Sequence, residues 1–190
     1  EMVLAGKVNK GLVNLLEVKG GNAMGISGMD GRLIEAKIKN EQLGYVGEIT
    51  SINKKPILDL LSNGYIPVVS TIGCDKDGNI FNINGDTAAA YIAGALQAER
   101  LIMMTDIAGI MRDQYDPKSL IPELSTEEAV QLYDKGVISG GMIPKVDSCI
   151  KAIEMGVQNC VIMNGCLPHS ILIELLTEEG AGTMITAHNK

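Results

Sequence analysis

The sequence predicts an α/β protein with a mainly parallel sheet sandwiched by helices. A helix pattern followed by a short apolar strand occurs three times before residue 105. Aromatic side chains are scarce, with five Tyr, one Phe and no Trp, so aliphatic residues and Met must fill the core. Short aliphatic strands covered by helices bury such residues well, because a parallel sheet is buried on both faces.

The amino-terminal half is expected to alternate helices with buried strands and to contain one antiparallel hairpin. Glu1 to Val18 has helical periodicity, and Gly20-Gly21 ends that helix. The stretch from Gly73 to Asn79 is rich in Gly and Asp and is expected to be a loop. The other expected elements are strands at 23–27, 33–38, 45–50, 66–70 and 101–104, and helices at 56–61 and 86–98.

The carboxy-terminal half continues the same alternation. Ser125 precedes Glu128 by three residues, which is the capping-box pattern at a helix start, and Gly136 marks the end of that helix. Pro144 suits the first turn of the next helix. The remaining expected elements are helices at 146–155 and 170–176 and strands at 160–163 and 182–185.

Composition excludes several classes of function. The formal net charge is -7, and no cluster of Lys and Arg interleaves with aromatics, so we expect no nucleic-acid partner. The apolar runs are too short to span a bilayer, so we expect no membrane association. Neither a disulfide framework nor a zinc site is indicated by the four scattered cysteines, which we expect to be reduced and buried: Cys74, Cys149, Cys160 and Cys166.

Polar side chains alternate just before the Ala-rich helix. Asn82, Asn84 and Asp86 occupy every second position, and in extended backbone such side chains point the same way. Two amides and a carboxylate could thus converge on a ligand at a strand end. Helix capping by Asn84 or Asp86 explains the same residues equally well on spacing alone.

Two further segments could receive a nucleotide. Thr105, Asp106 and Gly109 follow a buried strand, and ligands of open α/β sheets collect outside the carboxyl ends of strands. Gly140-Gly141-Met142 precedes Lys145 at a helix start, where adjacent glycines admit close approach and positive charge suits phosphate. An ordinary strand-to-loop turn and a Gly-Gly connector use the same residue types.

Taken together, these segments predict phosphoryl transfer, which depends on positioning and positive charge rather than on a covalent nucleophile. The sequence has no GxxxxGK[ST] loop and no HRD or DFG segment, so it is neither a P-loop enzyme nor a protein kinase.

The same segments, in this order, resemble the amino-acid kinase family, and within it the N-acetylglutamate kinase branch. The resemblance covers essentially the whole chain and implies the carbamate kinase-like fold. It is carried by EMVLAGKVNK (1–10), GISGMDGR (25–32), LGYVGE (43–48), NINGD (82–86), TDIAGI (105–110), GGMIPKV (140–146) and GAGTMI (180–185).

The resemblance implies a cytoplasmic transferase of arginine biosynthesis that phosphorylates the γ-carboxylate of N-acetyl-L-glutamate with ATP, its Mg2+ held largely by the phosphates. It implies homo-oligomers, dimeric or hexameric, and in some members allosteric inhibition by arginine. The implied roles are catalysis by Lys145 and Asp86, substrate binding by Asn82 and Asn84, nucleotide binding by Thr105, Asp106, Gly109, Gly141 and Met142, and an arginine site at His169, Glu174 and Gly180.

The family's amino-terminal lobe would lie upstream of Glu1. We therefore expect residues 1–72 to be the rest of a substrate-binding and dimerisation lobe and residues 73–190 to be the nucleotide lobe. Without the upstream lobe, we expect this polypeptide alone to be inactive. Lys19, before Gly20-Gly21, is interpreted as a solvated helix-end residue rather than as part of the family's phosphate loop. The alternatives are another acid kinase of the fold, such as a glutamate 5-kinase or an aspartokinase, and a non-catalytic module that binds arginine or a partner.

Overall fold

The computed structural model describes residues 1–113 and 115–187, and the chain divides into two compact units between Ala88 and Ala89. Helix α3 (Gly85–Leu96) begins in the first unit and continues into the second. The division lies later than the boundary expected between residues 72 and 73. It does so because the short strands β5 (Ile72–Cys74) and β6 (Ile80–Asn82) complete a sheet of the first unit.

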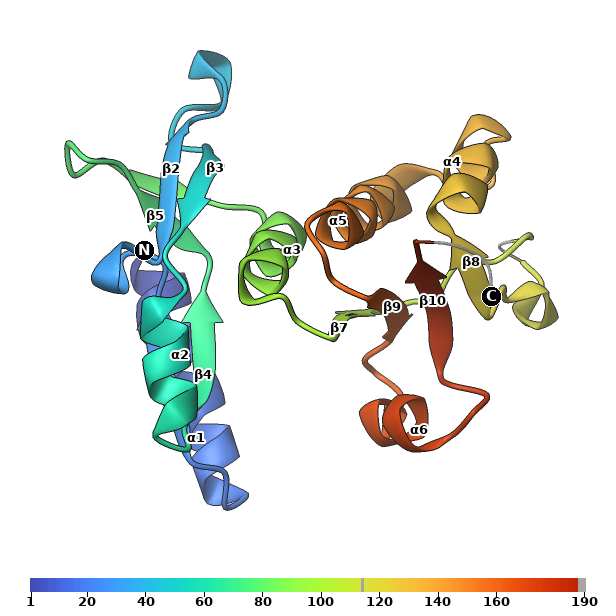
Figure 1. Ribbon diagram of the computed structural model, residues 1–190, viewed down its shortest axis with the longest axis horizontal. Coiled ribbons are helices and arrows are strands. Elements are labelled where there is room, and N and C mark those ends of the chain that lie inside the picture. Colours follow the sequence, from blue (N-terminus) through green and yellow to red (C-terminus); the bar gives the residue numbers. More distant parts are fainter. Residues whose placement is uncertain (114, 188–190) are drawn as a thin grey trace. The chain divides into compact units, whose positions relative to one another are not determined.

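A pair of parallel strands forms one part of the first unit. Strand β1 (Ala23–Ser27) pairs along its whole length with β4 (Ile66–Ser70). The π-helix η1 (Met2–Val8) runs into α1 (Asn9–Val18), and α1 and α2 (Lys55–Ser62) pack against this pair (Figure 1). The expected helix up to residue 18 and the strands at 23–27 and 66–70 are therefore confirmed.

The buried side chain of Asn9 ties helix α1 to both strands. Its Nδ2 donates to the carbonyl of Ile26 at 3.2 Å and to the carbonyl of Val68 at 2.8 Å. One amide therefore satisfies a backbone acceptor on each strand, as buried polar groups require.

The second sheet of this unit curls back on itself. Its order is β3-β2-β5-β6, with β2 (Ile34–Ile38) antiparallel to β3 (Gly47–Ile52), and a bridge between Val46 and Asn82 brings its two outer strands together. Gly47 permits this closure, since a Cβ there would lie 2.6 Å from Cδ1 of Ile83. The hairpin predicted from the sequence is confirmed.

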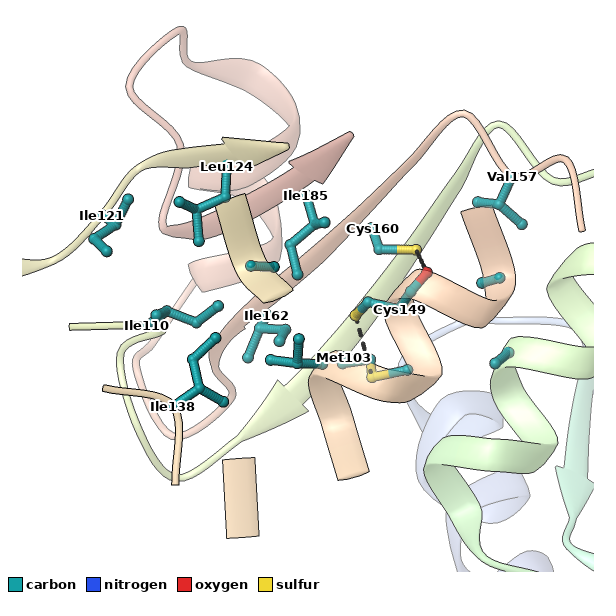
Figure 2. Close-up of a cluster of buried hydrophobic side chains, with 14 of the residues drawn as sticks. Met103, Ile110, Ile121, Leu124, Ile138, Cys149, Val157, Cys160, Ile162 and Ile185 are labelled. Carbon is teal, nitrogen blue, oxygen red and sulfur yellow. Dashed lines mark hydrogen bonds between the residues drawn. The ribbon is translucent and has the colours of Figure 1, made fainter. Parts of the chain in front are cut away.

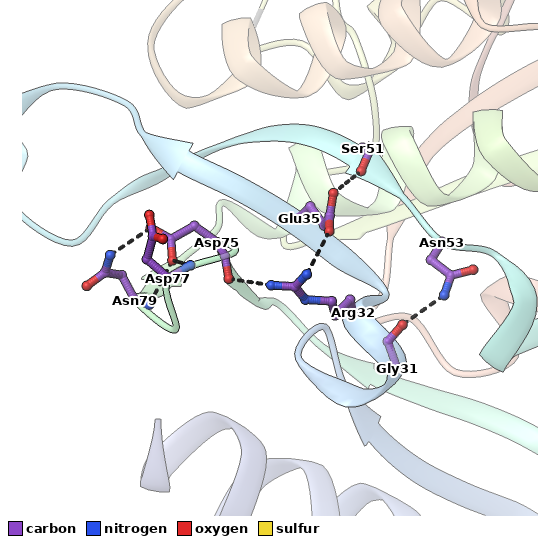
Figure 3. A network of polar contacts seen from close by, with 8 residues as sticks. All are labelled: Gly31, Arg32, Glu35, Ser51, Asn53, Asp75, Asp77 and Asn79. Carbon is purple, nitrogen blue, oxygen red and sulfur yellow. Dashed lines mark hydrogen bonds and ion pairs between the residues drawn. The ribbon is translucent and has the colours of Figure 1, made fainter.

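The loop expected from Gly73 to Asn79 is confirmed for residues 75–79, which form the turn of the β5–β6 hairpin, whereas Gly73 and Cys74 belong to β5. The Asp75 carboxylate closes its turn by accepting hydrogen bonds from the backbone N–H groups of Asp77 and Asn79 and from the Asn79 side chain. Arg32 joins this turn to β2, donating to the Asp75 carbonyl at 2.9 Å and pairing with Glu35 at 3.7 Å (Figure 3).

The sheet of the second unit has four strands in the order β7-β9-β10-β8. Pairing is parallel between β7 and β9 and between β10 and β8, and antiparallel between β9 and β10. Sequence reasoning missed β8, whose three residues are too few to show periodicity. The strands are β7 (Arg100–Thr105), β8 (Glu123–Ser125), β9 (Asn159–Asn164) and β10 (Gly182–Thr186).

Helices cover both faces of this sheet (Figure 1). Helices α4 and α5 lie on one face, and α6, which links β9 to β10, lies on the other. The capping box of α4 forms as predicted: Ser125 Oγ accepts from the Glu128 N–H at 3.1 Å and the Glu128 carboxylate accepts from the Ser125 N–H at 2.9 Å. The bounds are α4 (Thr126–Asp134), α5 (Ile143–Glu154) and α6 (Ser170–Leu176), with short 3-10 turns at Asp30–Arg32, Glu41–Leu43, Pro117–Ser119 and Gly140–Met142.

The core of the second unit lies between the sheet and α4 and α5 (Figure 2). Cys149 on α5 lies 3.7 Å from the Met103 sulfur on β7, and the Cys160 thiol donates to the Cys149 carbonyl at 3.5 Å. Three of the four cysteines are buried, as predicted, but Cys166 is exposed because it lies in the turn after β9 rather than in the strand.

Candidate active site

A pocket of about 530 Å³ lies in the second unit, where β7 ends and α5 begins. Six residues predicted from the sequence line it, although they come from two segments distant in the chain. These six lining residues are Thr105, Asp106, Gly109, Gly141, Met142 and Lys145.

One end of the pocket is formed by the start of α5. Gly140–Met142 make a 3-10 turn that leads directly into the helix, Gly140 adopts a positive φ of 54°, and a Cβ at Gly141 would meet no atom within 4 Å. Lys145 lies in the first turn of α5 and is half-buried. The open backbone, the helix N-terminus and the ammonium group together favour an anionic ligand here.

The other end is formed by the loop after β7. Thr105 is the last residue of that strand, and its hydroxyl donates to the Asp106 carboxylate at 3.1 Å. Gly109 has a φ of 152°, and a Cβ there would lie 2.6 Å from the Thr183 hydroxyl oxygen. This position therefore requires glycine for both conformation and space.

Sequence reasoning missed the apolar wall between these ends. It comes from the loop after β7 and from the segment that links α4 to α5, and it gives the pocket a surface suited to a flat, weakly polar group. Ile107 and Ile110 lie in the TDIAGI segment, but their apolar side chains do not differ from those of an ordinary core, and the other wall residues lie in no motif. The wall consists of Ile107, Ile110, Met111, Val137 and Ile138, and the exposed Tyr115 also lines the pocket.

The expected substrate residues lie in the first unit. Asn82 and Asn84 are exposed and alternate with the buried Phe81 and Ile83, as predicted for extended backbone. Asp86 departs from that pattern because it is in the first turn of α3. Asn84 also caps this helix, since its Oδ1 accepts from the Thr87 N–H at 3.0 Å.

Asp86 and Lys145 belong to different units, Asp86 to the first and Lys145 to the second. Convergence of these two side chains on a shared ligand therefore stays a prediction.

A second pocket of about 220 Å³ lies where α6 turns into β10. Glu174 and Gly180 line it, as does Arg100, whose guanidinium lies 3.8 Å from the buried Glu174 carboxylate. His169, the third residue of the expected arginine site, instead lines a shallow hollow beside α6.

Neither a metal cluster nor a membrane helix was found in the described ranges. Across residues 1–113 and 115–187, no group of three or more His, Cys, Asp or Glu side chains could hold a metal ion. Within the same ranges, every helix is too short or too polar to cross a bilayer.

Comparison with known proteins agrees with this architecture. The Amino acid kinase family matches residues 1–164, and the chain belongs to that family. Acetylglutamate kinase from Clostridium beijerinckii (strain ATCC 51743 / NCIMB 8052) is 52% identical over 188 residues, which are 97% of this chain and 66% of the relative. The chain thus spans about two thirds of the length of this relative.

Solved structures show the same fold. The crystal structure of smu.665 from Streptococcus mutans UA159 aligns with a TM-score of 0.82 at 29% identity, covering 98% of this chain and 70% of the other. N-acetylglutamate synthase from Neisseria gonorrhoeae, complexed with coenzyme A and L-arginine, aligns with a TM-score of 0.72 at 26% identity, covering 97% of this chain and 47% of the other.

Proposed function

We propose that the protein contributes the nucleotide site of an enzyme that transfers the γ-phosphoryl group of ATP to the γ-carboxylate of N-acetyl-L-glutamate. One observation carries this proposal. Residues from the TDIAGI and GGMIPKV segments, 30 or more positions apart in the sequence, line a single pocket, and Lys145 is one of them. The 52% identity to an acetylglutamate kinase supports the choice of acceptor.

The pocket suits the two ends of a nucleotide. The apolar wall would receive the base, and the start of α5 with Lys145 would receive the phosphates. Mg2+ would enter as part of the substrate, because it prefers phosphate and water oxygens and the pocket offers it a single carboxylate, Asp106.

The proposed reaction needs no general base. A carboxylate is already ionised at neutral pH, so its oxygen can attack the γ-phosphorus directly. The new O–P bond forms as the bond from the γ-phosphorus to the bridging oxygen breaks, and ADP leaves with that electron pair. Catalysis then depends on fixed positive charge that offsets the repulsion between two anions, the role proposed for Lys145. Asp86 would orient the catalytic lysines, and Asn82 and Asn84 would hold the acetylglutamate. The proposed enzyme acts in the cytoplasm.

Arginine is the proposed ligand of the second pocket. Glu174, Glu178 and Glu179 supply negative charge for a guanidinium group, and Arg100 supplies positive charge for a carboxylate. The arginine complex of the related synthase supports this proposal.

The substrate is tested in a protein extended upstream to the length of its relatives. A coupled ADP-release assay would compare N-acetyl-L-glutamate with glutamate, aspartate and carbamate, and we expect turnover with the first alone. Preference for another acceptor would refute the assignment. Calorimetric titration of the 190-residue chain with Mg-ATP tests the nucleotide site separately, because an arginine-binding module without kinase function would bind arginine but not Mg-ATP.

A further inference from the structure

The hydroxyl of Thr183 occupies a gap in the backbone pairing beside the nucleotide pocket. Thr183 lies on β10 and is fully buried. Its Oγ1 accepts a hydrogen bond from the Ile110 N–H at 2.9 Å and donates one to the Ile121 carbonyl at 2.7 Å. Ile110 lines the pocket, whereas Thr183 does not.

This bridge replaces one rung of an antiparallel pair. The Ile121 N–H donates directly to the Ile110 carbonyl at 2.9 Å, and Met111 and Leu120 continue the pairing. Opposed residues of an antiparallel pair commonly exchange two hydrogen bonds. Here the second bond, from the Ile110 N–H to the Ile121 carbonyl, passes through the Thr183 hydroxyl.

The pocket loop is built around that hydroxyl. A Cβ at Gly109 would lie 2.6 Å from Thr183 Oγ1 and 3.1 Å from the Thr183 N atom. Gly109 therefore packs directly against β10, where a side chain would not fit. The next residue, Ile110, is held in place by the Thr183 hydroxyl. Both backbone groups bound by Thr183 belong to residues that are at most 5% exposed, so water cannot readily replace the hydroxyl.

We propose that Thr183 is a positioning residue for the nucleotide site, acting through Gly109 and Ile110 rather than by touching the nucleotide. The inference rests on the proposed nucleotide site. It assigns a role in ligand binding to a residue of the carboxy-terminal strand that is outside the pocket and outside the residues 1–164 matched by the family.

The test compares Thr183→Val with Thr183→Ser in the 190-residue chain. Valine keeps the branched shape but removes both hydrogen bonds, whereas serine keeps the hydroxyl and loses the methyl group. We expect Thr183→Val to weaken Mg-ATP binding by about 10-fold, as the loss of partners for buried polar groups predicts, and Thr183→Ser to bind like the wild type. Amide hydrogen exchange at Ile110 should accelerate in Thr183→Val and not in Thr183→Ser.

A control separates positioning from general stability. Val161 is fully buried on the neighbouring strand β9, where it pairs with Met184, so Val161→Ala lowers stability without touching the Ile110 bridge. We expect it to leave Mg-ATP affinity unchanged. Equal losses of affinity in Val161→Ala and Thr183→Val would overturn the positioning role.

The remaining outcomes distinguish the two proposals. If the wild type binds Mg-ATP and Thr183→Val binds it equally well, the role of Thr183 is refuted and the nucleotide site stands. If the wild type does not bind Mg-ATP, the nucleotide site fails, and the role of Thr183 in ligand binding fails with it. Should Thr183→Val not fold, Gly109→Ala tests the same contact from the pocket side, and unchanged affinity in that variant refutes the inference.

Discussion

Replacing Lys145 with methionine tests the electrostatic basis of the proposed function. Lys145 is half-buried in the first turn of α5, and the change removes its charge while keeping a long side chain. A charge-assisted hydrogen bond contributes about 1.5–3 kcal/mol. Since about 1.4 kcal/mol corresponds to tenfold in affinity, Lys145→Met should weaken Mg-ATP binding by roughly 10- to 150-fold.

Isothermal titration of the 190-residue chain with Mg-ATP and Mg-ADP measures this loss. The loss should be smaller for Mg-ADP if Lys145 faces the γ-phosphate. Lys151→Met is the matched control, because Lys151 lies on the same helix but pairs with Glu154 at 3.2 Å and does not line the pocket. In a protein extended to the length of its relatives, Lys145→Met should also lower kcat by about 10²-fold. Equal Mg-ATP affinity in Lys145→Met and the wild type would refute the reasoning.

Three further predictions concern stability. Ser125→Ala removes the capping box of α4 and should lower the free energy of unfolding by about 1 kcal/mol in urea denaturation, and no change would show that the cap is dispensable. Gly94→Ala should lower the free energy of unfolding by roughly 1–3 kcal/mol, because the new Cβ would lie 2.5 Å from the Met155 Cβ. Gly11→Ala is the matched control: a Cβ there would meet no atom within 4 Å, so it should stabilise α1 by about 0.5–1 kcal/mol. Equal effects of the two variants would contradict the packing of α3. The Asn79 side-chain hydrogen bond, with backbone N–H groups, lowers the pKa of Asp75 below 3.8, so this carboxylate stabilises the fold above that value and loses its contribution as pH falls through the lowered pKa. Wild type and Asp75→Asn should therefore differ most in unfolding free energy near neutral pH and converge as the pH falls from 3.8 through the lowered pKa of Asp75, and a constant difference would contradict the assignment.

Local signals in the sequence predicted most of the fold. The Ser125 and Glu128 spacing predicted the start of α4, and continuous apolar runs predicted β1, β4, β7 and β9. Strands of three residues were missed because they lack periodicity and are held by tertiary pairing, as in β5, β6 and β8. The Gly- and Asp-rich composition correctly predicted the turn at residues 75–79, and only the short strands on either side of it were missed.

The candidate site was predicted only where function left a sequence motif. Gly141 and Lys145 could be found because glycines before a helix and a cation in its first turn are unusual enough to notice. Val137 and Ile138 could not, because a pocket wall and a hydrophobic core use the same side chains. Thr183 was likewise invisible, since a buried hydroxyl has meaning only once its two backbone partners are known.

The bridge between Val46 and Asn82 has a mechanical consequence. The Asn82 N–H donates to the Tyr45 carbonyl at 2.8 Å, and Tyr45 belongs to the exposed tip between β2 and β3. A displacement of that tip must either break this hydrogen bond or carry the Asn82 backbone with it. An antibody fragment or chemical crosslink that immobilises the tip would therefore also restrain a residue at the far edge of the curled sheet.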